Sequence, residues 1–167
     1  MLPTIIRLSS ESVRTLSTHP NDAVRSIHII VAEVKEVFHQ FDIWRMPELR
    51  NLDVSDSASQ VIRKTLAEEP REFFYRNRGI TISASCVSYD KRNNAVAIEL
   101  TDPIMHGIID GGHTYQIICN YMDDLGEEEK MHFSAYVRLE VLSGITDYDY
   151  LHDLFFERNF GPMRLAT

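Results

Sequence analysis

The chain has 167 residues, of which 44% are hydrophobic and 25% charged, and its formal net charge is −8. This length suffices for a buried core without disulfides or metals, and the acidic balance argues against a surface coated with basic residues for nucleic acid. No apolar run approaches the roughly 20 residues of a membrane helix, and the N-terminal segment lacks a basic leader. We therefore expect a cytoplasmic protein without a membrane partner.

The N-terminal third is predicted to form strands followed by a long connection. Residues 1–20 indicate an edge strand or an arm, and residues 26–33 have the β-branched density of a strand. Residues 34–40 either continue that strand or form a short helix. Residues 41–52 have mixed polarity, so we interpret them as a connection that Trp44 anchors to the core.

Helices are predicted where apolar residues recur every three or four positions between a capping residue and a stop signal. Ser55 or Asp56 can cap the first helix, and Pro70 ends it while being able to begin a second one. The predicted helices lie near residues 55–69, 70–76, 113–125 and 147–158.

The remaining apolar segments alternate or are short, which is typical of strands. We expect a half-buried strand over 79–89, a hairpin return over 95–100, a short strand over 107–109, and a strand with one wet face over 131–142. The fold class is therefore α/β (α+β), with a mixed sheet of about five strands. We expect one domain over residues 1–167, which could be the N-terminal fragment of a longer protein.

Two polar turns stand out, one before the predicted strand at residue 79 and one after the strand at 107–109. Residues 76–78 offer two guanidinium forks and an amide, which suit a phosphate group. Residues 110–114 form a strand, glycine turn and helix start, where free amides and the helix dipole favour an anion. The candidate ligand- and phosphate-binding residues are Arg76, Asn77, Arg78, Gly79, Asp110, Gly111, Gly112, His113 and Thr114.

Structural interpretations of the same residues remain open at this point. The second turn could be a tight strand-to-helix connection capped by Asp110, and the arginines could belong to a solvated helix face within residues 45–92, which carry a small excess of cations. Neither a Rossmann G-x-G-x-x-G nor a Walker G-x-x-x-x-G-K-[ST] spacing occurs.

The order FFYRNRGITI, hairpin, IIDGGHT resembles the abortive-infection phage-resistance family called AIPR. That family has an F-x-x-x-N-x-GI-T-I segment before a strand, turn and helix of the I-x-[ND]-G-x-x-T type, and the segment EEPREF also fits its pattern. The resemblance covers roughly residues 55–118 and puts Asn77, Gly79, Asp110, Gly111, His113 and Thr114 on matched positions. It implies a phage-defence protein of bacterial or phage origin, without implying a particular reaction.

The second turn is more distantly similar to the D-G-x-H-R turn of ParB-like and sulfiredoxin-like nucleotide-binding domains. Thr114 stands where those domains have an arginine. If the turn binds a nucleotide or nucleic-acid phosphate, we therefore expect the charge to come from Arg76 or Arg78.

Other functions are weighed against phosphate binding. His106, Asp110 and His113 have the residue types of a metal site, and Asp90, Glu99 and Asp102 are carboxylates that a metal-dependent nuclease acting on nucleic acid could use. Neither spacing compels a site, so no metal ligand and no catalytic residue is assigned, and the cofactor is unknown.

A non-enzymatic protein-interaction module is the third hypothesis. It would use the acidic C-terminal half and an apolar patch near Phe155 and Phe156. The two cysteines, Cys86 and Cys119, lie in apolar segments and are interpreted as buried thiols. Oligomeric state is not indicated.

Overall fold

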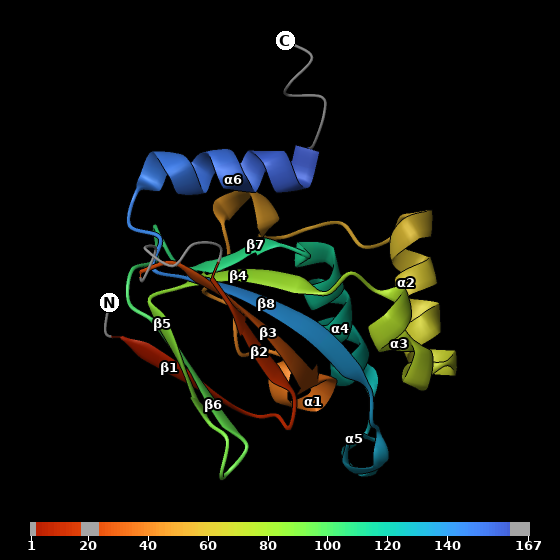
Figure 1. Ribbon diagram of the computed structural model, residues 1–167. Helices are drawn as coiled ribbons and strands as arrows, with labels where there is room; N and C mark the ends of the chain where they lie inside the picture. The colour runs from red at the N-terminus through yellow and green to blue at the C-terminus, as the bar shows by residue number, and fades with distance from the viewer. Residues whose placement is uncertain (1–2, 18–23, 161–167) are drawn as a thin grey trace.

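The computed structural model describes residues 3–17 and 24–160 (Figure 1). A five-stranded sheet lies at its centre, with a smaller three-stranded sheet beside it and most of the helices around the central sheet. The five-stranded sheet has the order β2-β3-β8-β4-β7 and the small sheet has the order β1-β6-β5. The predicted α+β class is confirmed.

The strands and helices have the following bounds. The central sheet contains β2 (Val13–Leu16), β3 (Ser26–Glu33), β4 (Ile80–Ala84), β7 (Gly107–Asp110) and β8 (Tyr136–Ser143), and the small sheet contains β1 (Thr4–Ser9), β5 (Cys86–Asp90) and β6 (Ala95–Leu100). The helices are α1 (Val34–Val37), the 3-10 turn η1 (Pro47–Leu49), α2 (Ser57–Glu68), α3 (Pro70–Arg76), α4 (Gly112–Asp124), α5 (Glu127–His132) and α6 (Tyr148–Phe160).

The central sheet is mixed because β4 runs parallel to β8, whereas all its other strand pairs are antiparallel. In Figure 1, α4 lies behind this sheet and α6 crosses above β7. Contacts join α4 to α2 and β4, α3 to β8, and α6 to β7. Within residues 3–17 and 24–160, none of the helices is long and apolar enough to cross a membrane.

The four predicted helices are all found, with no end shifted by more than two residues. Asp56 caps α2 by accepting a 2.8 Å hydrogen bond from the Ser59 amide. Pro70 ends that helix and begins α3, as its tolerance of the first helical turn predicts. Residues 34–37 take the helical alternative as α1.

The predicted strand over 79–89 is wrong as a single element. It breaks at Ser85, whose amide donates to the Glu99 carbonyl at 2.9 Å, and its halves join different sheets. The first half, β4, is buried at every position because sheet neighbours flank it and helices cover it. Alternation of small hydroxyl and apolar residues therefore marks a central strand here, and not one half-exposed to solvent.

The predicted strand over 131–142 begins later, at Tyr136. Residues 127–132 form α5, whose first turn carries three glutamates and whose last turn carries Lys130 and His132. This charge order matches the helix dipole and stabilises a short helix. The alternation from Tyr136 onward does give β8 one exposed face.

Trp44 anchors the long connection as predicted, and it does so through both backbone and side chain. Its ring is 1% exposed. Its carbonyl accepts from the Ile108 amide at 2.8 Å, and the Met46 amide donates to the Ile108 carbonyl at 3.1 Å. The connection therefore covers the outer edge of β7, which would otherwise present unpaired backbone groups.

Candidate functional site

The two polar turns meet at one end of the central sheet. Strands β4 and β7 are antiparallel neighbours, so the turn that precedes β4 and the turn that follows β7 lie at the same end. The register pairs Thr81 with Asp110 and then Ile82 with Ile108, which leaves Ile109 as an extra residue. Such a bulge re-aims the residues beside it, and here both Thr81 and Asp110 line the pocket described below.

Glycine is required where the two turns touch. Gly111 has φ +79°, and a Cβ built on it would lie 2.3 Å from the Gly79 carbonyl oxygen. Gly79 has φ +88°, and its Cβ would lie 2.2 Å from the Arg138 carbonyl oxygen. At both positions the backbone is left-handed and lies directly against another backbone segment. Only glycine, which lacks a Cβ, fits there. The glycines therefore hold three segments together in register.

A side-chain pair also joins the turns. Asn77 Nδ2 donates to Thr114 Oγ1 at 3.1 Å, and Thr114 Oγ1 can donate to Asn77 Oδ1 at 3.2 Å. Asn77 Oδ1 also accepts from the Gly79 amide at 2.8 Å, which shapes the first turn. Asp110 Oδ1 accepts from the Gly111 amide at 2.8 Å and shapes the second. Asn77 and Asp110 thus have structural roles in addition to any ligand contact.

A pocket of about 340 Å³ opens between these turns. We call it the two-turn pocket, and its walls are Ile62, Arg76, Asn77, Arg78, Gly79, Thr81, Asp110, Gly111, Thr114, Arg138, Glu140 and Arg158. Seven of the nine residues singled out in the sequence are among them. The sequence predicted that the two turns meet only because each of them adjoins one of two neighbouring predicted strands.

Gly112 and His113 do not line this pocket. Gly112 is buried against Leu49 and Leu52, and a Cβ there would make tight contacts with the two leucine side chains at 3.0–3.1 Å. His113 is exposed and lies within the electrostatic range of Asp53 and Asp56. The side chain of His113 therefore faces the start of α2.

The pocket walls carry four arginines against two carboxylates. Arg76 forms an ion pair with Glu69, and Arg158 forms one with Glu140 at 2.9 Å. Arg138 Nη2 donates to the Arg78 carbonyl at 3.1 Å, an uncharged acceptor. Among residues 3–17 and 24–160, neither Arg78 nor Arg138 has a carboxylate partner.

Three charged wall residues lay outside the sequence prediction. Arg138 and Glu140 are two residues apart on the wet face of β8, and Arg158 is on α6. The alternation of β8 showed that Arg138 and Glu140 share a face. It could not show that β8 pairs in parallel with β4, because parallel partners are distant in sequence and leave no local turn signal.

The residues of the rival hypotheses are placed separately. His106 is buried, and its Nδ1 accepts from the Thr101 and Asp102 amides at 3.0 Å. Burial lowers the pKa of His106. In the described residues it forms no metal-type cluster with Asp110 and His113.

The three carboxylates weighed for a nuclease each have a local partner. Asp90 accepts from turn amides, Glu99 accepts from the thiol of Cys86 at 3.2 Å, and Asp102 accepts from the Ile104 amide at 2.9 Å. Cys86 is exposed on β5, so its interpretation as a buried thiol is wrong, whereas Cys119 is buried. The hydrogen bond to Glu99 raises the pKa of Cys86.

Phe155 and Phe156 do not form the exposed patch expected of an interaction module. Phe155 is completely buried in the core, and Phe156 is partly buried against it. A larger hollow of about 700 Å³ lies elsewhere, with Glu11, Glu33 and Glu36 on its walls. Its three carboxylates against Lys35 disfavour an anion, so the smaller two-turn pocket is the better anion site.

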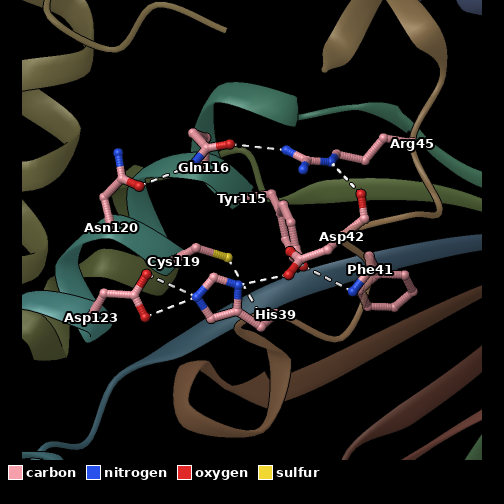
Figure 2. Close-up of polar contacts among 9 residues, drawn as sticks. All are labelled: His39, Phe41, Asp42, Arg45, Tyr115, Gln116, Cys119, Asn120 and Asp123. Carbon is pink, nitrogen blue, oxygen red and sulfur yellow. Dashed lines mark hydrogen bonds and ion pairs between the residues drawn. The ribbon is translucent and has the colours of Figure 1, made fainter. Parts of the chain in front are cut away.

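A second polar cluster was not anticipated from the sequence (Figure 2). His39 lies between Asp42, 2.8 Å from its Nδ1, and Asp123, 2.8 Å from its Nε2. Partial burial lowers the pKa of His39, but hydrogen bonds to Asp123 and Asp42 outweigh this effect, so the pKa is raised. Residues 39 and 123 are too distant in sequence for any motif to connect them.

The fold and the pocket define the class of protein: an α+β protein that joins an R-N-R-G turn and a D-G-G turn across antiparallel strands. The family model described as AIPR protein matches residues 50–154, which is more than half of the chain. The chain therefore belongs to the AIPR family, which links it to phage defence by abortive infection. Comparison with curated proteins and with solved structures gave no match. The more distant similarity to ParB-like domains stays a prediction.

Proposed function

We propose that the two-turn pocket binds the phosphate of a nucleotide or of a nucleic acid, in the service of phage defence. The observation that carries the proposal is the position of Arg78 and Arg138 on one pocket wall, without a carboxylate partner in the part of the chain that the structure describes. A guanidinium presents a planar set of donors that matches phosphate oxygens in a bidentate way.

The start of α4 supports the same ligand from the other side. Its cap residue is Gly111, which has no side chain to occupy the amides of the first turn. Those amides have no acceptor within the helix, and the helix dipole adds partial positive charge at this end. Gly111 and Thr114 both line the pocket, so an anion there would lie between the helix start and the arginines.

Asp110 makes a bare anion a poorer ligand than a nucleotide. Its carboxylate lies on the pocket wall and would repel a second negative group placed directly against it. A carboxylate is a good acceptor for the hydroxyls of a sugar. A ligand with its phosphate near Arg78 and its ribose near Asp110 would therefore be bound by both side chains. The pocket volume of about 340 Å³ is at the lower end of the range for small-molecule sites.

Calorimetric titration with a panel of nucleoside mono-, di- and triphosphates, short single-stranded DNA and RNA, and inorganic phosphate tests the proposal. Hydrogen bonds to charged groups contribute about 1.5–3 kcal/mol, so Arg78→Ala and Arg138→Ala should each weaken binding by roughly 10-fold to 100-fold. Raising the salt concentration should weaken binding by the parent chain.

His113→Ala is the matched control, because His113 is at the same helix start but outside the pocket walls. It should bind like the parent. If no member of the panel binds, or if Arg78→Ala binds as tightly as His113→Ala, phosphate recognition by this pocket is refuted. Asp110→Asn separates the two parts of the ligand: it should weaken nucleotides and strengthen inorganic phosphate.

A further inference from the structure

The loop that follows α1 and the inner face of α4 bring three different metal-ligand types together. His39 and Asp42 come from the loop, and Cys119 comes from the middle of α4. One donor atom from each, a ring nitrogen, a carboxylate oxygen and the sulfur, lie within 4.8 Å of one another. Figure 2 shows the Asp42 carboxylate pointing to the His39 ring and the Cys119 side chain next to that ring.

We propose that His39, Asp42 and Cys119 bind a thiophilic divalent cation of the Zn²⁺ type. Nitrogen, oxygen and sulfur donors together suit zinc better than magnesium or calcium, which select oxygen. Three protein ligands leave a fourth tetrahedral position for water, as in sites where zinc is open to a ligand. Tetrahedral zinc bonds of about 2.0–2.3 Å place the ligand atoms roughly 3.3–3.7 Å apart. On binding, His39 Nδ1 and Asp42 Oδ2, now 2.8 Å apart, would separate slightly, whereas the wider separations of up to 4.8 Å would shorten.

The two loop ligands are accessible to an ion. The side chains of His39 and Asp42 are 42% and 44% exposed, so solvent and a metal ion can reach them. Cys119 is only 1% exposed and provides a fixed point at the base of the site. When the ion binds, the Cys119 thiol proton leaves to solvent and the sulfur coordinates as a thiolate.

Groups outside the three ligands already orient them. Asp123 Oδ1 accepts a hydrogen bond from Nε2 of His39 at 2.8 Å, so Nδ1, which lies 2.8 Å from Asp42 Oδ2, is the nitrogen on the side of the proposed ion. A carboxylate behind a ligating histidine is the usual arrangement in zinc sites. The buried Tyr115 hydroxyl donates to Asp42 Oδ1 at 2.7 Å, which leaves Oδ2 on the side of His39.

These contacts also explain why the cluster is more than a surface ion pair. A salt bridge alone needs His39 and one carboxylate, and it does not require a buried thiol beside them. Here the His39 amide donates to Cys119 Sγ at 3.3 Å, so the loop backbone is fastened directly over the sulfur. His39 adopts φ +62°, a left-handed conformation that is uncommon for residues other than glycine, and its ring reaches Asp123 on α4.

Titration of the whole chain with Co²⁺ tests this site without knowledge of the activity. Co²⁺ takes the place of zinc and gives a near-ultraviolet charge-transfer band when a thiolate coordinates it. We expect saturation at one equivalent, a band that appears with it, and displacement of Co²⁺ by added Zn²⁺. A parent chain that does not bind Co²⁺ in a saturable way refutes the proposal.

Variants decide which sulfur is involved. Cys119→Ser should abolish the band, whereas Cys86→Ser is the matched control and should keep it, because Cys86 is exposed on β5 beside Glu99. A band that survives Cys119→Ser, or one that is lost with Cys86→Ser, overturns the assignment. His39→Gln keeps the sulfur and should weaken Co²⁺ binding at least tenfold, so it supplies a test if Cys119→Ser does not fold.

Asp123→Asn separates an orienting role from direct ligation. The loss of a carboxylate behind a ligating histidine typically weakens metal binding 10-fold to 100-fold. We expect a drop of that size with the charge-transfer band retained at saturation. Asp124→Asn, one residue further along α4 and paired with Arg63, is the control and should bind Co²⁺ like the parent. Equal binding by the two variants would contradict the arrangement.

Discussion

Replacing Gly111 with alanine tests whether the contact between the two turns holds the pocket together. A left-handed conformation costs a non-glycine residue about 1–2 kcal/mol. The new Cβ would also lie 2.3 Å from the Gly79 carbonyl oxygen and 2.9 Å from the Ile80 Cα, and both neighbours are backbone atoms that a rotamer change cannot move. We expect a total loss of about 2–4 kcal/mol in the free energy of unfolding.

This loss should lower the Tm by roughly 5–15 °C for a chain of this size, measured by circular dichroism during heating. Gly126→Ala is the control, because Gly126 has an ordinary φ of −69° and the nearest atom to its Cβ would be Glu129 Oε1 at 3.4 Å. Its Tm should stay close to that of the parent chain.

Gly111→Asn separates the two causes. Asparagine tolerates the left-handed conformation better than alanine does, but its Cβ meets the same backbone atoms. If the contact dominates, the asparagine variant is as unstable as the alanine variant. If both variants are no less stable than Gly126→Ala, the reasoning about the turn contact is refuted.

Two further predictions concern buried polar groups. Burial lowers the pKa of His106 in the folded chain, so the unfolded chain binds a proton at this imidazole more readily than the folded chain does. The folded state therefore keeps its full stability above about pH 6.5 and loses stability as the pH falls below that value. His106→Asn retains an acceptor for the two amides but cannot titrate, so urea unfolding from pH 7 to 5 should show a flatter pH dependence, by at most about 1.4 kcal/mol per pH unit. Parallel curves would contradict this. Tyr115→Phe leaves the buried Phe41 amide without its 2.8 Å acceptor and should cost about 1–3 kcal/mol in urea unfolding. The exposed Tyr136→Phe is its control, and equal stability of the two variants would show that the Tyr115 hydroxyl is dispensable.

Local signals in the sequence predicted the elements around the pocket well. Pro70 both ends α2 and begins α3, and the glycine pair after β7 marks the change from strand to helix. Each signal acts within a few residues, since it depends on a fixed φ or on a cap. The elements from residue 55 to the start of α4 could therefore be placed from sequence, apart from the break at Ser85.

The break at Ser85 shows what local signals omit. Alternation continues from β4 into β5, so nothing in the residue pattern marks the point where the chain leaves one sheet for the other. The decision depends on pairing: β4 lies between β8 and β7, whereas β5 lies at the edge of the small sheet beside β6. Such partners are chosen by burial of the whole sheet, and a window of ten residues does not contain that information.

The same limit explains the wall residues that the sequence prediction lacked. Arg138 enters the pocket only because β8 is the parallel neighbour of β4, and Arg158 enters it only because α6 packs against β7. His39 and Cys119 meet across an interval of 80 residues. In each case the sequence showed the chemical type of the side chain, but it did not show which residues lie next to it in the fold.

Family membership bears on the two sites differently. The family model matches residues 50–154, so it contains the walls of the two-turn pocket with the exception of Arg158. Of the three proposed metal ligands, His39 and Asp42 precede the matched region, whereas Cys119 lies within it, as do the orienting residues Tyr115 and Asp123. Phosphate binding is therefore a proposal about a part of the chain shared with its family, whereas metal binding depends on the segment before that part. The titrations with Co²⁺ and with nucleotides can fail separately, because no residue belongs to both sites.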